Sequence, residues 1–275
     1  MRMIKYRSRG PEVRLLEEIL QKMGYDLYVS DYFGKDTHEA IMDFQRKNSL
    51  VVDGIVGIKS WSKLLALNPD ILNENSKLLS ERDLEDFATK YGLEIATVKA
   101  VNEVESRGKG FLVDGRAKIL FEGHVFWKQL KSRGVDPNAH FNQQTSDILY
   151  PEWTRSHYKG GAGEYDRLQK ARDISPGQTF SDAANSSASW GSFQIMGYHA
   201  KTLGYSSVDD FVSKMQLHER EHLDAFGRFL EVNQLIRLLK DKNWQGFAKR
   251  YNGPLYARNK YDERLQKAYD RYLNV

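Results

Sequence analysis

The chain is 275 residues long, which exceeds the roughly 100–200 residues of a typical domain and favours two folded units of unequal size. With 40% hydrophobic residues, 28% charged residues and a formal net charge of +4, it can bury cores and is not wholly disordered. The lack of cysteine excludes disulfide bonds, thiol nucleophiles and cysteine-bound zinc.

The first unit begins with an amphipathic helix. Val13, Leu16, Ile19 and Leu20 recur at helical spacing, and Gly24 follows where a C-terminal glycine belongs. The sequence before them, residues 1–6, leads into polar residues without an apolar signal core. We therefore expect no secretion signal.

A short repeat follows this helix. Residues 53–61 repeat residues 30–38 with an offset of 23 positions. Each copy predicts a turn that uses the conformational freedom of glycine, followed by Thr37 or Ser60 as the cap of a helix. The two helices after the turns are expected over residues 39–47 and 61–67.

Glycine and aromatic motifs run through residues 1–67: Gly10-Pro11-Glu12-Val13, Gly24-Tyr25, Phe33-Gly34-Lys35-Asp36-Thr37, Phe44-Gln45, Asp53-Gly54-Ile55-Val56-Gly57 and Trp61. This pattern resembles the three-helix peptidoglycan-binding domain appended to many cell-wall hydrolases. One departure is Ser30-Asp31, where that family usually has Asp-Gly, so we expect an altered first turn. The resemblance implies peptidoglycan as a partner and makes Tyr25 and Tyr32 candidate substrate contacts, whereas Trp61 is expected in the core.

A break in composition separates the two units. Residues 68–79 contain Pro69 and are expected to form a linker between a domain at 1–67 and a larger domain at 80–275. Ser80 starts a capping pattern, and the helix after it is expected to end at Gly92.

Helical spacing recurs through the second unit, so the fold class is expected to be mainly α. Residues 118–121 are the main candidate for a strand. Residues 151–189 include the run Gly160-Gly161-Ala162-Gly163 and predict an irregular lobe or lid between helices. No run approaches the ~20 apolar residues that span a bilayer, so we expect no stable membrane insertion.

A largely apolar helix is expected over residues 93–106, ended by Arg107-Gly108-Lys109-Gly110. Glu103 and Glu105 lie near its C-terminus and project about 200° apart, so at most one of them can face a shared cleft. The helix dipole and partial burial both favour the protonated form there, as a general acid requires. Surface or ion-paired glutamates are the alternative interpretation.

Four motifs bracket the second unit: residues 101–111, residues 119–126, Trp190-Gly191-Ser192-Phe193-Gln194-Ile195-Met196-Gly197 and residues 251–259. They resemble the N-acetylmuramidase domain of modular phage endolysins and, in their order, the wider lysozyme-like group that includes goose-type lysozymes and soluble lytic transglycosylases. The resemblance implies a lysozyme-like α-helical domain that hydrolyses the β-1,4 bond between N-acetylmuramic acid and N-acetylglucosamine and so causes host cell lysis.

The same resemblance assigns the site residues. Glu105 is the expected catalytic acid because Ser106 follows it, and Glu103 is then expected to be structural. Gln194 is a candidate for sugar binding, with a turn-stabilising role as the alternative. Tyr251 is expected to contact the substrate near the cleaved bond. Asn252 either lines the same wall of the substrate cleft, opposite Gln194, or only shapes the turn before Pro254.

A second carboxylate is not fixed by the sequence. Glu122 is the leading candidate, and the alternative is a buried glutamate that pairs with Arg116 or His124. Asp114 and Asp182 remain further candidates. The separation of the two carboxyl groups would distinguish a retaining mechanism, at about 5–5.5 Å, from an inverting one, at about 6.5–9.5 Å.

Three other activities are open alternatives. A lytic transglycosylase that forms 1,6-anhydromuramic ends could use the same glutamic acid. The run His218-Glu219-Arg220-Glu221-His222 matches the zinc-peptidase pattern, but Ala225 and Arg228 stand where the longer motif has glycine and histidine. A wall-binding protein with a degenerate catalytic domain is the third, and the presence of Glu105, Gln194 and Tyr251 argues against it.

No metal or organic cofactor is implied, and neither is a nucleic-acid partner. Residues 228–275 hold 11 Lys and Arg against 5 Asp and Glu, a basic end that could meet anionic wall polymers. We expect a monomer that is made in the host cytoplasm and acts on the cell wall, in the periplasm, after release through a pore formed by another protein.

Overall fold

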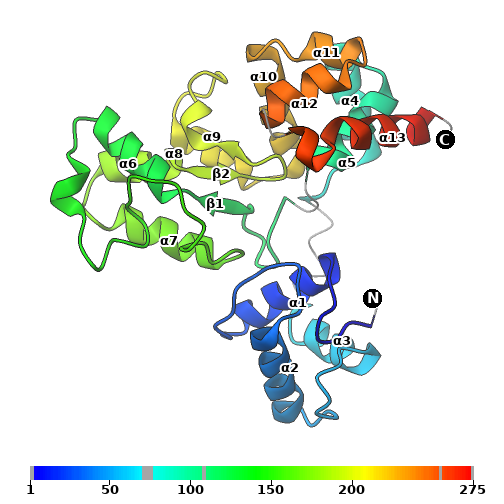
Figure 1. The fold of residues 1–275 in the computed structure, drawn as a ribbon, viewed down its shortest axis with the longest axis vertical. Helices are drawn as coiled ribbons and strands as arrows, with labels where there is room; N and C mark the ends of the chain where they lie inside the picture. Colours follow the sequence, from blue (N-terminus) through cyan, green and yellow to red (C-terminus); the bar gives the residue numbers. More distant parts are fainter. Residues whose placement is uncertain (1–2, 70–76, 107–109, 254–255, 274–275) are drawn as a thin grey trace. The chain divides into compact units, whose positions relative to one another are not determined.

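The computed structural model describes residues 3–69, 77–106, 110–253 and 256–273 (Figure 1). Within them the chain is mostly helical, with helices α1 to α13 and three short strands, which confirms the mainly α fold class. Its internal contacts divide it into two units, Met1–Ser76 with Phe111–Ala188 and Lys77–Gly110 with Ser189–Val275. The predicted linker falls largely on residues 70–76, outside the described residues, so the domain boundaries at 67 and 80 stay predictions.

The helices and the strand of the first unit are α1 (Pro11–Lys22), α2 (Lys35–Lys47), α3 (Ile58–Ala66), β1 (Ile119–Phe121), α6 (Gly123–Ser132), η3 (Pro137–His140), α7 (Gly163–Arg172) and α8 (Gln178–Ser186). The strand predicted at residues 118–121 is confirmed. Helices α1 to α3, coloured blue to cyan in Figure 1, surround one apolar core that contains Leu16, Phe33, Phe44 and Trp61. The expectation that Trp61 packs in the core is confirmed, since its side chain is buried.

The predicted caps of α2 and α3 are wrong. Both helices begin earlier, with Gly34 and Gly57 as their N-caps, at φ −84° and −92°, so neither glycine uses left-handed backbone. Thr37 and Ser60 lie inside the first turns, where their hydroxyl groups bond to buried side chains of a preceding helix. The prediction failed because the hydroxyl groups form hydrogen bonds with side chains that are distant in the sequence, and not with the helix N-terminus.

Glu17 and Gln45 are those buried partners, and each fixes one copy of the repeat. Glu17 on α1 accepts hydrogen bonds from the backbone N–H of Ser30 (2.6 Å) and the hydroxyl of Thr37 (2.7 Å). Gln45 on α2 donates to Ser60 (3.3 Å) and accepts from the backbone of the second turn. Burial, the largest influence, raises the pKa of Glu17 although these hydrogen bonds lower it.

Ser30 does not disrupt the first turn. Its hydroxyl accepts from the N–H two residues later at 3.0 Å, as the carboxylate of Asp53 does in the second copy at 2.9 Å. Both side chains therefore form the same kind of local turn, in which a side-chain oxygen replaces a backbone acceptor. The first turn keeps the hydrogen bond of the second one despite the change in residue.

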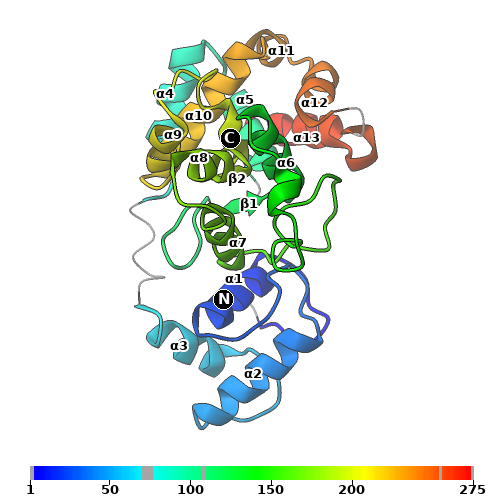
Figure 2. The same ribbon diagram turned by 90° about the vertical axis from the view of Figure 1, so that its left-hand side faces the viewer.

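The irregular lobe predicted at residues 151–189 contains two helices, α7 and α8, so that prediction is wrong over residues 163–186. Helix α7 buries Glu164 and Arg167 as well as Leu168 and Ala171, which leaves no recognisable apolar stripe in the sequence. Helix α8 buries mainly small and polar residues. It packs against α6 and α7, which lie beside it in Figures 1 and 2.

Helix α7 is anchored by a buried ion pair. Glu164 and Arg167 are both almost fully buried and lie 2.8 Å apart. Glu164 also accepts from the N–H of Phe121 in β1 (3.1 Å), and Arg167 donates to the carbonyl of the same residue (2.8 Å). The pair therefore joins α7 to the strand that leads into Glu122.

The elements of the second unit are α4 (Glu81–Tyr91), α5 (Ile95–Glu105), β3 (Ile195–Met196), η4 (Gly197–His199), α9 (Val208–Met215), α10 (Glu219–Val232), α11 (Ile236–Lys240), α12 (Trp244–Asn252), η5 (Tyr256–Asn259) and α13 (Tyr261–Leu273), while β2 (Ala188–Trp190) straddles the boundary. Ser80 and Asp83 form the predicted capping box, and Gly92 ends α4 in the left-handed conformation. Both predictions for α4 are confirmed.

Helix α5 lies at the centre of the second unit. It packs against α4 and most extensively against α13, and it buries residues on most of its faces, as its sequence predicts. Strands β2 and β3 pair antiparallel, with Trp190 opposite Ile195. The sequence analysis missed this ladder, because two or three buried residues show no alternating pattern.

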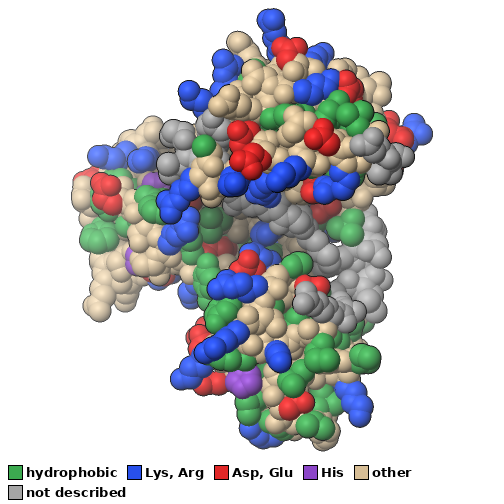
Figure 3. Space-filling view, turned by 45° about the vertical axis from the view of Figure 1, so that its right-hand side comes forward, with side chains coloured by type: hydrophobic (Ala, Val, Ile, Leu, Met, Phe, Trp, Pro, Cys, Tyr) green, Lys and Arg blue, Asp and Glu red, His purple; other side chains and the backbone are tan. Residues whose placement is uncertain are grey.

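Lys and Arg share the surface with acidic groups. Figure 3 shows the two signs interleaved over the face in view. Several cations of the basic end pair with acidic side chains, among them Arg228 with Asp224 and Arg271 with Glu103. Among the described residues, no helix combines the length and apolar character needed to span a membrane.

Candidate active site

Glu105 occupies the C-terminal position of α5. Its side chain is buried, with 6% of the residue exposed. The side-chain amide of Asn252, the last residue of α12, donates a hydrogen bond to Oε1 of Glu105 at 3.1 Å. Asn252 therefore does more than shape the following turn, because it contacts the carboxyl group that the sequence singled out.

Glu103 faces a different direction. Its carboxylate accepts hydrogen bonds from Arg271 (2.5 Å) and Tyr272 (2.8 Å) on α13, and its side chain is 44% exposed. Partial burial opposes its charge, but these two donors outweigh that effect and lower the pKa of Glu103. These contacts fit the expectation that Glu103 is structural, since it joins α5 to α13.

Tyr251 precedes Asn252 on α12 and is held among aromatic rings. Its ring stacks on Phe247 with a centroid separation of 5.5 Å and meets Phe226 edge-on at 5.5 Å. The hydroxyl group donates to the carbonyl of Phe193 at 3.4 Å. Tyr251 therefore connects α12 to the turn that contains Gln194.

Gln194 lies in the turn between β2 and β3, with left-handed backbone at φ 51°. Its amide nitrogen donates to the carbonyl of Gly191 (2.7 Å), and its amide oxygen accepts from the hydroxyl of Ser189 (2.8 Å). Both contacts stabilise the turn, which is the alternative role that the sequence left open. The side chain is half-buried, so a second contact with a ligand is compatible with this position.

The His218 to His222 segment contacts both the turn that contains Gln194 and the chain at Gly110. Glu219 accepts hydrogen bonds from the N–H groups of Gly110 (2.6 Å) and Leu79 (3.0 Å). A Cβ atom at Gly110 would lie 2.4 Å from Nδ1 of His222, and one at Gly191 would lie 2.6 Å from the same ring. The two glycines therefore permit the backbone to approach the histidine, which explains their place in the motifs.

Both ring nitrogens of His222 are used inside the protein. Nδ1 lies 3.2 Å from the N–H of Ser192, and Nε2 lies 2.7 Å from the carbonyl of Met215. This network corresponds to a neutral ring, with Nδ1 accepting and Nε2 donating. Burial lowers the pKa of His222 to about 4, which also keeps the ring neutral.

These contacts do not resemble a zinc site. His218 caps α10 through the N–H of Arg220 (2.9 Å), and the carboxylate of Glu219 is engaged by backbone donors. Among the described residues, no cluster of three or more His, Asp or Glu has the arrangement of a metal site. The segment therefore forms the start of α10, and its side chains contact the backbone at Gly110 and in the turn after Gly191.

In the first unit, Glu122 is the N-cap of α6, and its side chain is 15% exposed. The hydroxyl of Tyr158 donates to Oε2 of Glu122 at 2.6 Å, and Nδ1 of His124 lies 3.4 Å from the same oxygen. Burial, followed by the hydrogen bond to Glu122, raises the pKa of Tyr158. The pairing with His124 that the sequence left open is reduced to proximity, because Nδ1 of His124 forms no hydrogen bond within the described part of the chain and burial lowers the pKa of His124.

The other candidate carboxylates have local partners. Asp114 forms hydrogen bonds with the guanidinium of Arg116 at 2.9 and 2.6 Å. Asp182 accepts from Gln178, one turn earlier on α8, at 2.7 Å. Both are half-buried, as Glu122 is, but neither accepts a hydrogen bond from the hydroxyl of Tyr158, as Glu122 does.

The two candidate tyrosines of the N-terminal helices also lie in the first unit. The hydroxyl of Tyr25 donates to Asp43 at 2.8 Å, and burial together with this carboxylate raises the pKa of Tyr25 to about 12. The guanidinium of Arg9 lies 4.3 Å from the ring centre of Tyr32. Both rings are half-buried, so each keeps some exposed surface.

The structure brings four of the predicted site residues together in the second unit: Glu105, Asn252, Tyr251 and Gln194. Glu122, Tyr25 and Tyr32 belong to the first unit. Tyr158 was not among the predicted site residues. Glu219 and His222 were considered only as part of a zinc-binding pattern. Tyr158 carries no sequence signal, whereas the buried role of His222 was hinted at by its helical spacing with Leu223 and Phe226.

Comparisons with known proteins give matches to both parts of the chain. The N-acetylmuramidase family model matches residues 94–273, and a peptidoglycan-binding domain model matches residues 9–64. The crystal structure of the Burkholderia AP3 phage endolysin is 39% identical over 100% of both chains, with a TM-score of 0.67. The N-acetylmuramoyl-L-alanine amidase CwlM of Mycobacterium tuberculosis is 26% identical over 121 residues, which are 43% of this chain and only 29% of that protein.

The N-acetylmuramidase match covers more than half of the chain and contains all four site residues of the second unit. The endolysin match extends over the full length. The chain therefore belongs to the N-acetylmuramidase family of lysozyme-like hydrolases.

Proposed function

We propose that this protein binds peptidoglycan and hydrolyses the β-1,4 bond between N-acetylmuramic acid and N-acetylglucosamine, with Glu105 as the general acid. The observation that carries the proposal is the buried carboxyl group of Glu105 at the end of α5, with the amide of Asn252 on one of its oxygens. The end of a helix disfavours negative charge, so this position suits a proton donor.

In this mechanism Glu105 gives its proton to the glycosidic oxygen as the bond from C1 of the muramic sugar breaks. Asn252 acts as a positioning residue, because its hydrogen bond fixes the orientation of the carboxyl group. Proton donation by a positioned side chain typically contributes about 10²–10⁴-fold to a rate. A misoriented acid would lose much of that contribution.

Water then attacks the sugar, and Glu122 is our candidate for the second carboxylate. Its support is local: a partly enclosed carboxylate, which accepts a hydrogen bond from Tyr158 and lies 3.4 Å from Nδ1 of His124, follows directly after β1. Gln194 and Asn252 are proposed to contact the sugars, and Tyr251 to contact the substrate close to the cleaved bond. Tyr25 and Tyr32 are proposed to contact the wall through their exposed ring surfaces.

The biological role follows from the same proposal. Cleavage of the glycan strands would cause lysis of the host cell, after synthesis in the host cytoplasm and passage through a pore formed by another protein. The similarity of the chain, over its full length, to the Burkholderia AP3 phage endolysin supports this role. We propose a monomer that acts on the wall with peptidoglycan as its partner.

The test is mass spectrometry of the soluble fragments released from purified peptidoglycan, with and without borohydride reduction. Hydrolysis predicts muramic ends that borohydride reduces. Release of 1,6-anhydromuramic ends would replace the proposal with lytic transglycosylation, and intact glycan with cleaved stem peptides would replace it with a peptidase.

A further inference from the structure

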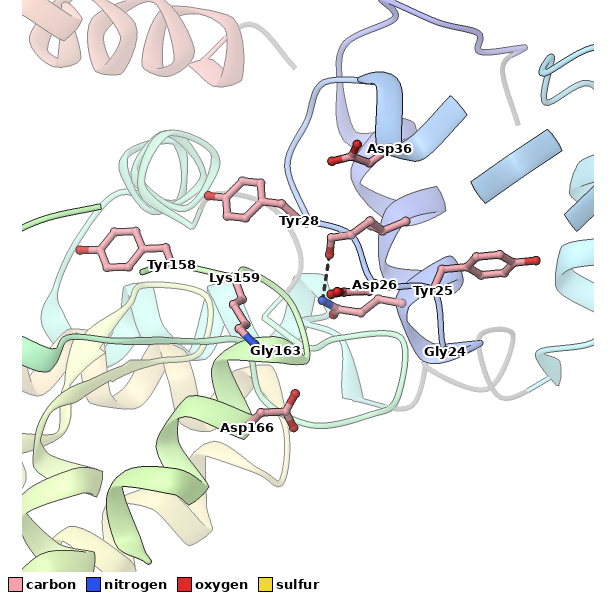
Figure 4. A pocket seen from close by; sticks show the side chains of 11 residues that line it. Gly24, Tyr25, Asp26, Tyr28, Asp36, Tyr158, Lys159, Gly163 and Asp166 are labelled. Carbon is pink, nitrogen blue, oxygen red and sulfur yellow. Dashed lines mark hydrogen bonds between the residues drawn. The ribbon is translucent and has the colours of Figure 1, made fainter. Parts of the chain in front are cut away.

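A cavity of about 510 Å³ opens between the N-terminal helices and the loop before α7, entirely within the first unit (Figure 4). Asp26, Tyr28 and Asp36 line it from the N-terminal side, and Tyr158, Lys159 and Asp166 line it from the other side. The function proposed above gives roles to two of the lining residues, Tyr25 and Tyr158, but none to the charged groups of the lining.

Specific backbone contacts join its two walls. The N–H of Val29 donates to the carbonyl of Lys159 at 3.2 Å, and the N–H of Ala162 donates to Oε1 of Gln21 at 2.8 Å. Gly160 and Gly161 have left-handed backbone, at φ 68° and 51°. The walls therefore meet through a short, defined stretch of chain.

The glycine run makes this approach possible. A Cβ atom at Gly160 would lie 2.5 Å from the carbonyl oxygen of Val29, and one at Gly161 would lie 2.8 Å from Oε1 of Gln21. Larger residues would push the two walls apart. The sequence of this glycine run suggested a flexible lid. In the structure the run is the segment that packs closely against Gln21 and Val29.

The loop that carries Lys159 is fixed on its other side by Glu164. One carboxylate oxygen of Glu164 accepts from the N–H groups of Lys159 (2.7 Å) and Gly160 (3.0 Å). Its other oxygen binds Arg167 and the N–H of Phe121. The cavity is therefore built on the same anchor as β1, and Tyr158 both lines the cavity and donates to Glu122.

The charges of the lining are uneven. The lining contains three carboxylates, on Asp26, Asp36 and Asp166, and one ammonium group, on Lys159. Figure 4 places Asp36 and Asp166 at opposite sides of the view, with Lys159, Tyr28 and Tyr158 between them. Such a lining attracts a group that carries an amine together with a carboxylate and repels a purely anionic one.

We propose that this cavity binds the stem peptide of peptidoglycan through a diamino acid whose side chain ends in an amine and a carboxylate, an inference that rests on the proposed function. The amine faces the aspartates, the carboxylate faces Lys159, and the rings of Tyr28 and Tyr158 contact the aliphatic part of the side chain. The N-acetylated sugars of the glycan offer no cation to these carboxylates, which favours the peptide as the occupant.

This assignment gives the wall-binding region a direct part in presenting the substrate. A stem peptide held between the N-terminal helices and the Lys159 loop keeps its own glycan strand near the enzyme. Holding a ligand at a second point raises the effective concentration of the rest of it. Stem-peptide binding therefore lowers KM on natural strands without changing the chemical step.

The test uses isothermal titration of the full chain with a soluble stem tetrapeptide that contains diaminopimelate, and with the same peptide acetylated on the side-chain amine. We expect the acetylated peptide to bind at least about tenfold more weakly, as expected for loss of one charged contact. The double variant Asp36→Asn, Asp166→Asn and the single variant Lys159→Met are each expected to weaken binding of the free-amine peptide by a similar factor.

Glu39→Gln is the matched control, because Glu39 lies on α2 as an exposed acid outside the cavity lining. Its affinity for the tetrapeptide should equal that of the unaltered chain. The comparison of the two peptides needs no variant, so it stays decisive even where a substitution impairs folding.

Absence of tetrapeptide binding, or equal binding of the two peptides, would overturn this inference. Release of reducible muramic ends from peptidoglycan, measured on the same preparation, reports separately on the proposed function. A chain that releases such ends but does not bind the tetrapeptide refutes the stem-peptide site alone, whereas a chain that releases none refutes the proposed function.

Discussion

The side-chain nitrogen of Asn252 lies 3.1 Å from Oε1 of Glu105, so the last residue of α12 touches the last residue of α5. The two residues are 147 positions apart in the sequence. Two helix C-termini thus converge on one buried carboxyl group. This contact ties the Tyr-Asn motif near the end of the chain to the Glu-Ser motif near its middle.

Replacement of Glu105 by Gln is expected to lower the rate of reducing-end release from peptidoglycan by at least about 100-fold, because the amide cannot donate the proton of a general acid. Binding to insoluble wall should persist. Glu103→Gln serves as the matched control and should stay within a few-fold of the unaltered rate, since the hydrogen bonds to Glu103 come from Arg271 and Tyr272 on α13. Comparable losses in both variants would contradict the assignment.

Removal of the positioning amide through Asn252→Ala is expected to lower kcat by about tenfold, which corresponds to the loss of about 1.4 kcal/mol of transition-state stabilisation. The carboxyl group of Glu105 keeps its chemistry but loses a contact that orients it. Asn233→Ala, which changes an exposed asparagine at the end of α10, is the control for a general effect of the substitution. A change in KM alone would instead indicate a role in binding.

The role of Glu122 is tested by Glu122→Gln, which should lower kcat by at least about 100-fold if this carboxylate assists the attack of water. Tyr158→Phe removes its 2.6 Å donor and should cause a smaller loss. Asp182→Asn alters a half-buried carboxylate of the same unit, whose partner is Gln178 on the same helix, and should have no effect. A Glu122→Gln variant that retains full activity would leave Glu105 as the only assigned carboxyl group.

The buried pair of Glu164 and Arg167 should dominate the stability of α7. Glu164→Gln leaves the guanidinium of Arg167 without its charged partner, and loss of one member of a buried pair typically costs about 3–5 kcal/mol. The double variant Glu164→Gln, Arg167→Met should cost less than that single change, because it removes the unpaired guanidinium while the amide oxygen at position 164 can still accept from the backbone N–H groups. Urea denaturation of the three proteins gives the comparison, and a double variant less stable than Glu164→Gln would argue against it.

His222 is expected to make folding sensitive to pH between its ordinary pKa of 6.5 and its folded value of about 4. In that window the unfolded chain binds a proton at His222 that the folded chain does not, so stability falls as the pH falls. Below pH 4 the loss of unfolding free energy caused by His222 reaches about 3 kcal/mol. Urea midpoints at pH 7 and pH 5 should therefore differ more for the unaltered chain than for His222→Gln, and equal differences would show that other groups cause the dependence.

The sequence predicts those elements whose signals are local. Ser80 and Gly92 delimit α4 through a capping box and a left-handed glycine, and both lie within the helix or next to it. The burial of α5 follows from its apolar residues on nearly every side. The family motifs likewise identify Glu105, Gln194, Tyr251 and Asn252 as one group, which the structure places in one unit.

The wrong predictions concern residues whose interaction partners are distant in the sequence. Thr37 looked like a cap because its acceptor, Glu17, is twenty residues away. Helix α7 looked irregular because an ion pair replaces its apolar stripe, and the benefit of that pair depends on β1. The contact of the Gly160 loop with Val29 is equally invisible in the sequence, since glycine runs indicate flexibility as often as close packing.

The packing of α5 against α13 has a consequence for synthesis of the chain. Helix α5 is complete at residue 105, but Arg271 and Tyr272, its partners at Glu103, are synthesised 168 and 169 residues after Glu103. A nascent or prematurely terminated chain therefore leaves one side of the helix that carries Glu105 uncovered. The packing of α5 in the second unit can be completed only after α13 has been synthesised, whereas α1 to α3, which share a core of their own, can fold earlier.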